Sequence, residues 1–208
     1  MTDPLTITTI RHSTTAHNAA QIISGRIDEP LSDAGRALAQ ELRDLLGPLG
    51  ADTVVSSPMR RARETAAIVT TAGDGDLVTS DLAVERDYGL LEGIPPEEVA
   101  RYADRITYIE KGGIRHSLNP PGGESFEQVR SRAEGTLEFL RTLPGPTLIL
   151  VAHQTFLQQL HGLLLGHDVH ESLALDIRTL QVDRFELNGA GPARHQAVHP
   201  GMGSHRSW

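Results

Sequence analysis

The stretch Thr147-Leu-Ile-Leu-Val-Ala-His153 is apolar from Leu148 to Ala152 and then ends at a histidine. A strand with one solvent-exposed face alternates apolar and polar residues, whereas a continuous apolar run of this length is typical of a strand buried on both faces. Such strands occur in parallel sheets that are covered by helices on each side. The stretch therefore predicts an α/β fold with a largely parallel sheet, in which His153 follows a buried strand.

The residues on either side of this strand alternate between strand and helix patterns. Apolar and β-branched residues predict further strands over 5–10, 52–55 and 180–187, a weaker one at 77–78 and a short edge strand at 194–198. Capping and breaking residues predict the helices between them: Ser32 before one that ends at Gly47-Pro48, Ser57 and Pro58 at the start of the next, Ser125 with Gln128 as a capping box, and Gly166 at the end of the last. This alternation predicts a three-layer α/β/α fold with a mostly parallel central sheet.

The length of 208 residues suits one well-packed domain, and we expect residues 1–208 to form a single unit. Residues 94–120 differ from the rest because they are rich in charge and glycine. We interpret them as an insertion that covers the substrate, with a short helix at 95–102. From about residue 199 we expect a mobile tail.

Composition excludes several classes of function. The chain has no cysteine, which removes disulfides, thiolate metal sites and thiol nucleophiles. Lys111 is the single lysine and does not follow a glycine-rich loop, so a Walker A phosphate loop is excluded. The formal net charge of -8 argues against nucleic-acid binding, and no apolar run approaches the roughly 20 residues of a membrane span. We therefore expect a cytoplasmic protein whose partner is a small molecule rather than nucleic acid or a membrane.

Reactive polar residues follow three of the predicted strands at the point where each strand ends. Arg11-His12 follows the first strand, Ser56-Ser57 and then Arg61 follow the second, and His153 follows the buried one. In open α/β sheets, ligands bind at the carboxyl ends of the strands, so we expect these side chains to converge on one crevice. Two guanidinium groups beside imidazole suit a dianionic phosphoryl group, with a ring nitrogen presented to its phosphorus.

The chain resembles the histidine phosphatase superfamily, the family of the cofactor-dependent phosphoglycerate mutases. Six motifs carry this resemblance, in the family's order, over residues 5 to 155: Ile10-Arg-His-Ser-Thr-Thr-Ala-His-Asn18, Gly25 to Ser32, Ser56-Ser-Pro-Met-Arg-Arg-Ala-Arg-Glu-Thr-Ala66, Leu82 to Gly93, Pro121-Gly-Gly-Glu-Ser125 and Val151-Ala-His153. The resemblance implies a phosphoryl-transfer enzyme of the phosphoglycerate mutase-like branch.

The resemblance also implies a role for each matching residue. Neutral His12 would attack phosphorus in line and form a phosphohistidine, while Arg11, Arg61 and a protonated His153 would hold the three equatorial oxygens, with help from Asn18. Glu85 would protonate the departing alkoxide and then activate water as a carboxylate. No metal or other cofactor is required.

Two positions depart from the family pattern. Ser13 replaces the usual glycine after the nucleophile, and Gln154-Thr155 replace the usual two glycines after the second histidine. We expect Ser13 and Gln154, together with Asn18, Arg26 and Tyr88, to contact the substrate. Other assignments stay open: Glu92 and Glu124 lie in nearby motifs and compete with Glu85 as proton donor, Arg26 could instead bind Asp28, and His153 or Arg61 alone could be structural or solvated.

The sequence favours a phosphatase that acts on a small phosphorylated metabolite. A mutase must accept an acidic substrate in two orientations, which requires additional positive charge over the site. In segment 94–120 the basic residues are balanced by acidic ones, so this excess of positive charge is missing. Mutase-type transfer, a regulatory protein phosphatase and a non-catalytic phosphate-ester binding module are the alternatives. The leaving group stays undetermined among phosphosugars, phosphoglycerates, nucleotides and specialised intermediates. A homodimer is possible because Leu163-Leu-Leu165 could be core or interface.

Overall fold

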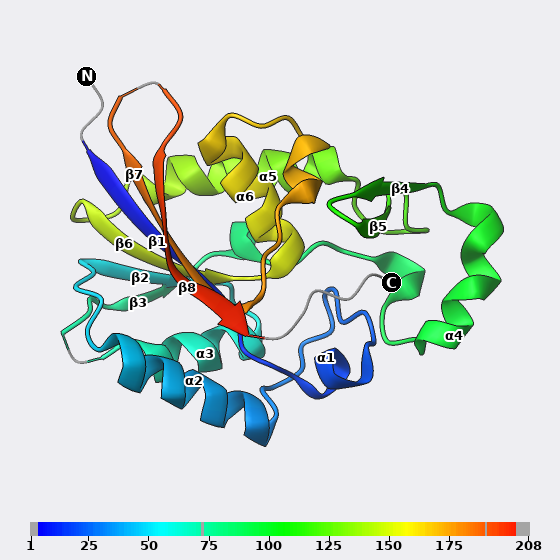
Figure 1. Ribbon diagram of the computed structural model, residues 1–208, viewed down its shortest axis with the longest axis horizontal. Coiled ribbons are helices and arrows are strands. Elements are labelled where there is room, and N and C mark those ends of the chain that lie inside the picture. Colours follow the sequence, from blue (N-terminus) through cyan, green and yellow to red (C-terminus); the bar gives the residue numbers. More distant parts are fainter. Residues whose placement is uncertain (1–3, 72, 190, 203–208) are drawn as a thin grey trace.

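A mixed sheet of six strands forms the centre of the molecule (Figure 1). The structure is a computed structural model and describes residues 4–71, 73–189 and 191–202. The strands lie in the order β3-β2-β6-β1-β7-β8. Their bounds are β1 Leu5–Arg11, β2 Thr53–Ser56, β3 Leu77–Thr79, β6 Thr147–Ala152, β7 Thr179–Leu187 and β8 Arg194–Met202. Strands β3, β2, β6 and β1 are parallel, whereas β7 and β8 are antiparallel to their neighbours. The predicted, mostly parallel sheet is confirmed.

Helices cover both faces of this sheet. Helices α2 (Asp33–Leu46) and α3 (Arg60–Val69) lie on one face, and α5 (Phe126–Leu140) and α6 (Gln154–Leu165) lie on the other (Figure 1). Strand β6 contributes to two hydrophobic cores: Ile149 and Val151 pack with α2 and α3, while Leu148 and Leu150 pack with α5 and α6. Successive side chains of a strand point to opposite faces, so an uninterrupted apolar strand serves both cores. The three-layer α/β/α prediction is confirmed.

Local capping signals set most of the helix boundaries. The Ser32 hydroxyl accepts from Gly35 N–H at the start of α2, Ser125 and Gln128 form the capping box of α5, and Gly166 ends α6 with φ 80°. Helix α3 is present as predicted, but its predicted start was wrong, because the helix begins at Arg60 and Ser57 does not cap it. The side chain of Asp28, in a distant loop, accepts from Arg60 N–H at 2.6 Å. The first turn of α3 is therefore capped from outside its own segment.

Residues 96–117 stand beyond the carboxyl ends of β1 and β6 (Figure 1). We call them the cap. They comprise α4 (Pro96–Val99), the 3₁₀ segment η3 (Ala100–Arg105) and a separate hairpin of β4 (Tyr108–Lys111) with β5 (Ile114–Ser117). The predicted short helix corresponds to α4 and η3, whereas the hairpin was not predicted. The remaining short elements are α1 (Ala16–Ala20), η1 (Asp81–Ala83), η2 (Gly89–Leu91) and η4 (Glu171–Ala174).

The last described strand is longer than the sequence indicates. Strand β8 runs to Met202, which pairs with Thr179 of β7, and Pro200 pairs with Gln181. Proline is tolerated on an edge strand because its missing N–H faces no neighbour. Residues 199–202, which the sequence places in a mobile tail, belong to β8 in the structure, and residues 203–208 lie outside the described part of the chain.

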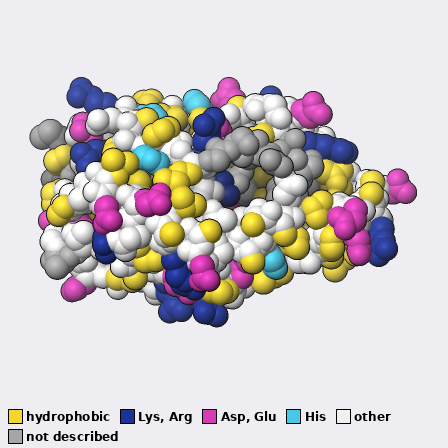
Figure 2. All heavy atoms as spheres, turned by 60° about the horizontal axis from the view of Figure 1, so that its bottom comes forward, with side chains coloured by type: hydrophobic (Ala, Val, Ile, Leu, Met, Phe, Trp, Pro, Cys, Tyr) yellow, Lys and Arg dark blue, Asp and Glu magenta, His cyan; other side chains and the backbone are white. Residues whose placement is uncertain are grey.

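The surface of the described residues gives two further findings. No helix among them combines the length and the apolar character that crossing a bilayer requires. Acidic and basic side chains are interspersed over the face drawn in Figure 2, which is therefore a surface of mixed charge. Leu164 is buried and Leu165 packs against the core on the α5 and α6 side, so this part of the leucine run serves the interior.

Candidate active site

Three neighbouring strands deliver polar residues to one edge of the sheet. Strand β6 lies between β1 and β2, with Arg11 opposite Ala152 and Ser56 opposite Val151. His12, Ser57 and His153 are the next residues of the three strands, so the register places them together. The rings of His12 and His153 lie 5.0 Å apart, centroid to centroid.

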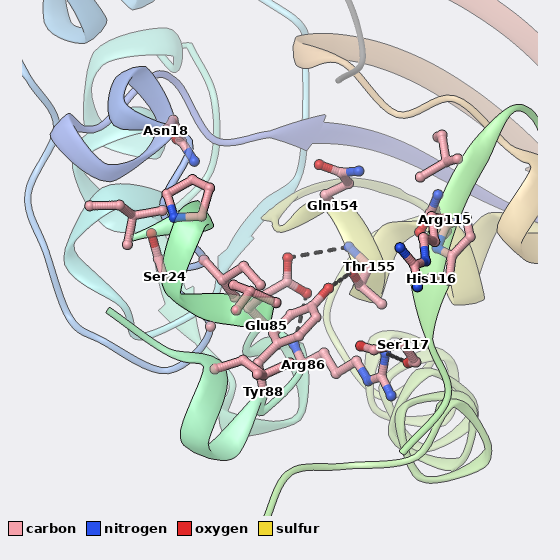
Figure 3. Close-up of a pocket in the computed structure, with 18 of the residues that line it drawn as sticks. Asn18, Ser24, Glu85, Arg86, Tyr88, Arg115, His116, Ser117, Gln154 and Thr155 are labelled. Atoms are coloured by element: carbon pink, nitrogen blue, oxygen red, sulfur yellow. Dashed lines mark hydrogen bonds between the residues drawn. The ribbon is translucent and has the colours of Figure 1, made fainter. Parts of the chain in front are cut away.

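A cavity of about 370 Å³ opens at this edge. Of the residues predicted for the site, those that line it are Arg11, His12, Asn18, Arg61, Glu85, Tyr88 and Gln154. In Figure 3, Glu85, Tyr88 and Thr155 lie together in the middle, with Asn18 on one side and Arg115 and His116 of β5 on the other. The cavity therefore extends from the sheet edge to the cap.

The hydrogen bond of His12 fixes its tautomer. Its Nδ1 lies 2.7 Å from the carbonyl oxygen of Ser13, and because a carbonyl only accepts, Nδ1 carries the ring proton. Burial lowers the pKa of His12 well below its usual value, and the charges of Arg61 and Arg11 lower it further. The ring is therefore neutral at physiological pH, with its lone pair on Nε2.

His153 is fully buried and contacts Ser57. Its Nε2 lies 2.8 Å from the Ser57 hydroxyl oxygen. The same oxygen accepts a hydrogen bond from Met59 N–H. The buried hydroxyl has Nε2 as acceptor for its own proton, which leaves the ring proton on Nδ1, a buried atom without a partner. Burial lowers the pKa of His153 well below its usual value, and Arg61 and His12 add to the effect. The protein's own groups thus favour neutral His153. The protonated form that the resemblance implies belongs to the substrate complex and stays a prediction.

Two guanidinium groups, that of buried Arg61 and that of half-buried Arg11, bring positive charge to the cavity. Arg61 donates from Nη1 to the Ile27 carbonyl and from Nη2 to the Gly25 carbonyl, each at 2.7 Å. Arg11 donates from Nη1 to the Ile177 carbonyl at 2.7 Å. These acceptors are neutral, and the Nε atoms of both arginines are buried without a partner. Burial lowers the pKa of Arg11 to about 10, so it stays charged at neutral pH. An anion would satisfy this charge.

Of the three candidate proton donors, Glu85, Glu92 and Glu124, Glu85 lines the cavity and the other two do not. It is 7% exposed and lies at the N-terminus of α6, where its Oε2 accepts from Thr155 N–H at 3.2 Å and its Oε1 from Phe156 N–H at 3.2 Å. The competing carboxylates are used elsewhere: Glu92 accepts from the backbone of Tyr88 and Arg26, and Glu124 binds Arg132.

The other cavity residues are held by local contacts. Tyr88 shares a hydrogen bond of 2.8 Å between its hydroxyl and that of Thr155, and burial and Glu85 raise the Tyr88 pKa. The Oδ1 of Asn18 accepts from Thr15 N–H in the capping box of α1. Gln154 lines the cavity from the first turn of α6.

Two predicted substrate contacts are corrected by the structure. The Ser13 hydroxyl is buried and donates to the Gly35 carbonyl at 2.7 Å, so its side chain turns toward α2. Arg26 neither lines the cavity nor binds Asp28. It donates from Nε to the Glu85 carbonyl at 2.9 Å and pairs through Nη2 with Glu124 at 3.1 Å. Both partners are distant in sequence, which is why local patterns did not indicate them.

Sequence reasoning missed the roles of Ser57 and Arg86. Arg86 is fully buried and donates to the backbone carbonyls of Ser117, Leu118 and Glu124. Its guanidinium lies 3.8 Å from the centroid of the Phe126 ring. Arg86 stands between two acidic residues, Glu85 and Asp87, so its local sequence is typical of an exposed charge. For Ser57, the available signal was a hydroxyl at a strand end.

No group of three or more histidine, aspartate or glutamate side chains among the described residues is placed to hold a metal ion.

Known proteins align with this chain over most of its length. It is 32% identical over 196 residues to the bifunctional protein Rv2228c of Mycobacterium tuberculosis, an alignment that covers 92% of this chain and 53% of that protein. The chain thus spans about half the length of the first curated relatives that it matches. It is also 29% identical over 184 residues to the protein named "Probable phosphoglycerate mutase GpmB" of Salmonella paratyphi C, covering 85% of this chain and 82% of that one.

The fold recurs in solved structures. A mycobacterial glucosyl-3-phosphoglycerate phosphatase superposes with a TM-score of 0.74 at 23% sequence identity, over 94% of this chain and 98% of that chain. The family model for branch 1 of the histidine phosphatase superfamily matches residues 7–197. This match includes every residue placed above at the sheet edge, and the chain belongs to the histidine phosphatase superfamily.

Proposed function

We propose that the chain is a metal-independent phosphomonoesterase that hydrolyses a small phosphorylated metabolite through a phosphohistidine on His12. The observation that carries the proposal is the neutral His12 ring, with Nδ1 bound to the Ser13 carbonyl and Nε2 left as the nucleophile beside Arg11 and Arg61. Membership of the superfamily supports a phosphatase-type enzyme.

In the first step, Nε2 of His12 attacks phosphorus as the ester P–O bond breaks on the opposite side. The guanidinium groups of Arg11 and Arg61 bind the equatorial oxygens, where the charge of the transition state accumulates. Arg11, Arg61 and Asn18 line the cavity. The Nε atoms of both arginines and Nδ1 of His153 are buried without a partner, and we assign these groups as donors to the phosphoryl oxygens. These charges supply the stabilisation for which other phosphatases use a metal ion.

His153 acquires its proton with the substrate. The pKa of its ring is lowered by burial and by neighbouring cations, and a phosphoryl dianion opposes both effects because it is a negative charge beside the ring. The neutral ring of the structure and a protonated ring in the substrate complex are therefore two stages of one cycle.

Glu85 transfers the protons. As an acid it protonates the departing alkoxide, and as a carboxylate it then takes a proton from the water that attacks phosphohistidine, so that the P–N bond breaks and phosphate leaves. Its Oε2 accepts one hydrogen bond, from Thr155 N–H, and has room for this proton. General acid–base catalysis of this kind contributes about 10²–10⁴ in rate.

Mutase-type phosphoryl transfer is the second candidate. The relative named as a probable phosphoglycerate mutase, which aligns over 85% of this chain, favours it. A mutase passes the phosphoryl group of His12 back to an organic acceptor and excludes water, whereas the proposed phosphatase passes it to water.

The test is phosphate release from phosphosugars, phosphoglycerates, nucleotides and an aryl phosphate, in the presence of a chelator. We expect activity that His12→Ala removes, that Glu85→Gln reduces strongly for alkyl esters, and that is unaffected by His170→Ala at an exposed position. Transfer between positions of phosphoglycerate without phosphate release would identify a mutase. Saturable binding of esters without turnover would identify a binding module.

A further inference from the structure

The end of the cavity opposite His12 has an apolar wall. The cap contributes Pro96, Val99, Ala100, Ala103, Tyr108 and Ile114 to the lining. Ile22, Ile23 and Leu91 line the cavity from outside the cap. A volume of about 370 Å³ falls within the range of small-molecule sites, about 300–1,000 Å³, so the cavity has room for more than a phosphoryl group.

The cations near this wall are already engaged. Arg86 lines the cavity, but its Nε, Nη1 and Nη2 donate to the carbonyls of Glu124, Ser117 and Leu118, at 2.9, 2.7 and 3.1 Å. Arg115 is exposed, and its guanidinium lies 3.8 Å from the centroid of the Tyr108 ring. A carboxylate or second phosphate on the leaving group would thus meet water-exposed Arg115, with His116 beside it on β5. Exposed ion pairs contribute little.

The polar side chains that line the cavity nearer to Glu85 are also held by the protein. The Thr155 hydroxyl bonds to Tyr88, and the amide nitrogen of Gln158 donates to the Leu175 carbonyl at 2.8 Å. The Ser24 hydroxyl donates to Glu29. A leaving group rich in hydroxyls would lose water here and find few replacements for it.

We propose that the cavity selects phosphate monoesters whose leaving alcohol carries an apolar chain or ring, which packs against the wall formed by the cap. This inference rests on the proposed phosphatase function and names its substrate class. It disfavours phosphosugars and phosphoglycerates as preferred substrates. The phosphoryl group would bind at Arg11 and Arg61, and the apolar group would extend past Glu85 to Val99 and Ala103.

A series of primary alkyl phosphates tests this selection, because their leaving groups have similar intrinsic reactivity. From ethyl to hexyl phosphate we expect kcat/KM to rise about fourfold for each methylene group that becomes buried. Propyl phosphate should exceed glycerol 3-phosphate, which has the same carbon skeleton with two hydroxyls, by at least about tenfold. A flat or falling series, or preference for glycerol 3-phosphate, would overturn the inference and leave the phosphatase function intact.

Variants locate the selection in the cap. Ala103→Glu puts a carboxylate into the apolar wall at an exposed position, and we expect it to reduce the ratio of kcat/KM for hexyl over ethyl phosphate at least about tenfold. Thr107→Glu adds the same charge to the cap at an exposed residue outside the lining and should keep the wild-type ratio. Equal effects of the two substitutions would contradict the assignment of Ala103 to the binding wall.

Binding of alkylphosphonates, measured by calorimetry, separates the inference from the proposed function because these compounds carry a C–P bond in place of the ester bond and are not hydrolysed. Hexylphosphonate should bind more tightly than ethylphosphonate to wild type, and Ala103→Glu should remove the difference. That result without hydrolysis of any phosphate ester would support the apolar wall and overturn the phosphatase. Equal binding of the two phosphonates would overturn the apolar wall, whatever the activity.

Discussion

One hydrogen bond decides which nitrogen of His12 is free to react. The Ser13 carbonyl accepts a hydrogen bond from Nδ1–H, and burial together with the neighbouring guanidinium groups of Arg61 and Arg11 keeps the ring neutral. The same arginines that attract the phosphoryl group therefore also prepare its acceptor. Charge recognition and nucleophile activation are properties of one small group of side chains.

The influence of Arg61 on His12 can be measured directly. Because the Arg61 charge lowers the pKa of His12, Arg61→Met should raise that pKa toward the ordinary histidine value, as followed by NMR titration of the imidazole. The exposed neighbour Arg60→Met serves as the control. An unchanged His12 titration in Arg61→Met would contradict the electrostatic account of the neutral ring.

Glu85 has a role that depends on the leaving group. Replacing it by Gln should reduce kcat/KM for an alkyl phosphate by about 10²–10⁴, and much less for an aryl phosphate, because a phenolate departs without a full proton transfer. Steady-state kinetics with the two esters give the comparison. Equal losses for both would assign Glu85 a structural role at the start of α6.

At the scale of the elements, the cap is fastened to the rest of the protein by Arg86. Its bonds to the carbonyls of Ser117 and Leu118 join the end of β5 to the segment that carries Glu85. Its planar fork serves three acceptors and stacks on Phe126, which a lysine cannot do. The position of the apolar wall relative to Glu85 thus depends on one buried side chain.

Arg86→Lys should therefore destabilise the protein by about 3 kcal/mol, since buried carbonyls lose their donors, and should reduce hydrogen-exchange protection in residues 108–117. Arg115→Lys is the control, because Arg115 belongs to the same hairpin but is exposed and contacts the Tyr108 ring. It should change the free energy of unfolding by less than about 0.5 kcal/mol. Similar exchange in Arg86→Lys and wild type would show that the cap is fastened by other contacts.

At the scale of the whole molecule, buried neutral histidines link stability to pH. Burial lowers the pKa of His161 to about 4, below the value of an unfolded chain, and its Nε2 lies 2.8 Å from the Thr9 hydroxyl. Between these two pKa values the unfolded state binds the extra proton, so stability falls as the pH falls from about 6.5 to about 4. His12 and His153 act in the same direction.

Removing one of these histidines should weaken the pH dependence. In His161→Gln, the loss of unfolding free energy between pH 6.5 and 5.0 should be smaller than in wild type by about 1.6 kcal/mol. The slope for one proton reaches about 1.4 kcal/mol per pH unit only below the pKa of the unfolded histidine. Denaturant titrations at the two pH values provide the measurement, with the exposed His170→Gln as control. Parallel curves for wild type and His161→Gln would contradict the linkage.

The parts of the molecule that were predicted correctly are those whose signals are local. The apolar run 147–152 and the Ser125 and Gln128 capping box lie within the elements that they specify. The hairpin at 108–117 depends on Arg86, about 30 residues earlier in the chain, and α3 depends on Asp28. The neutral state of His153 depends on its burial and on Arg61, so it required the three-dimensional arrangement.

A covalent phosphoryl group on Nε2 of His12 is the central step of the proposed mechanism, and rapid acid quenching during turnover of an aryl phosphate in chelator tests it most directly. We predict a burst of phenolate equal to the enzyme concentration and an acid-labile phosphoryl group that peptide mass spectrometry places on His12, both absent in His12→Ala. Turnover without a burst, with unmodified His12 and with activity retained in His12→Ala, would contradict the account.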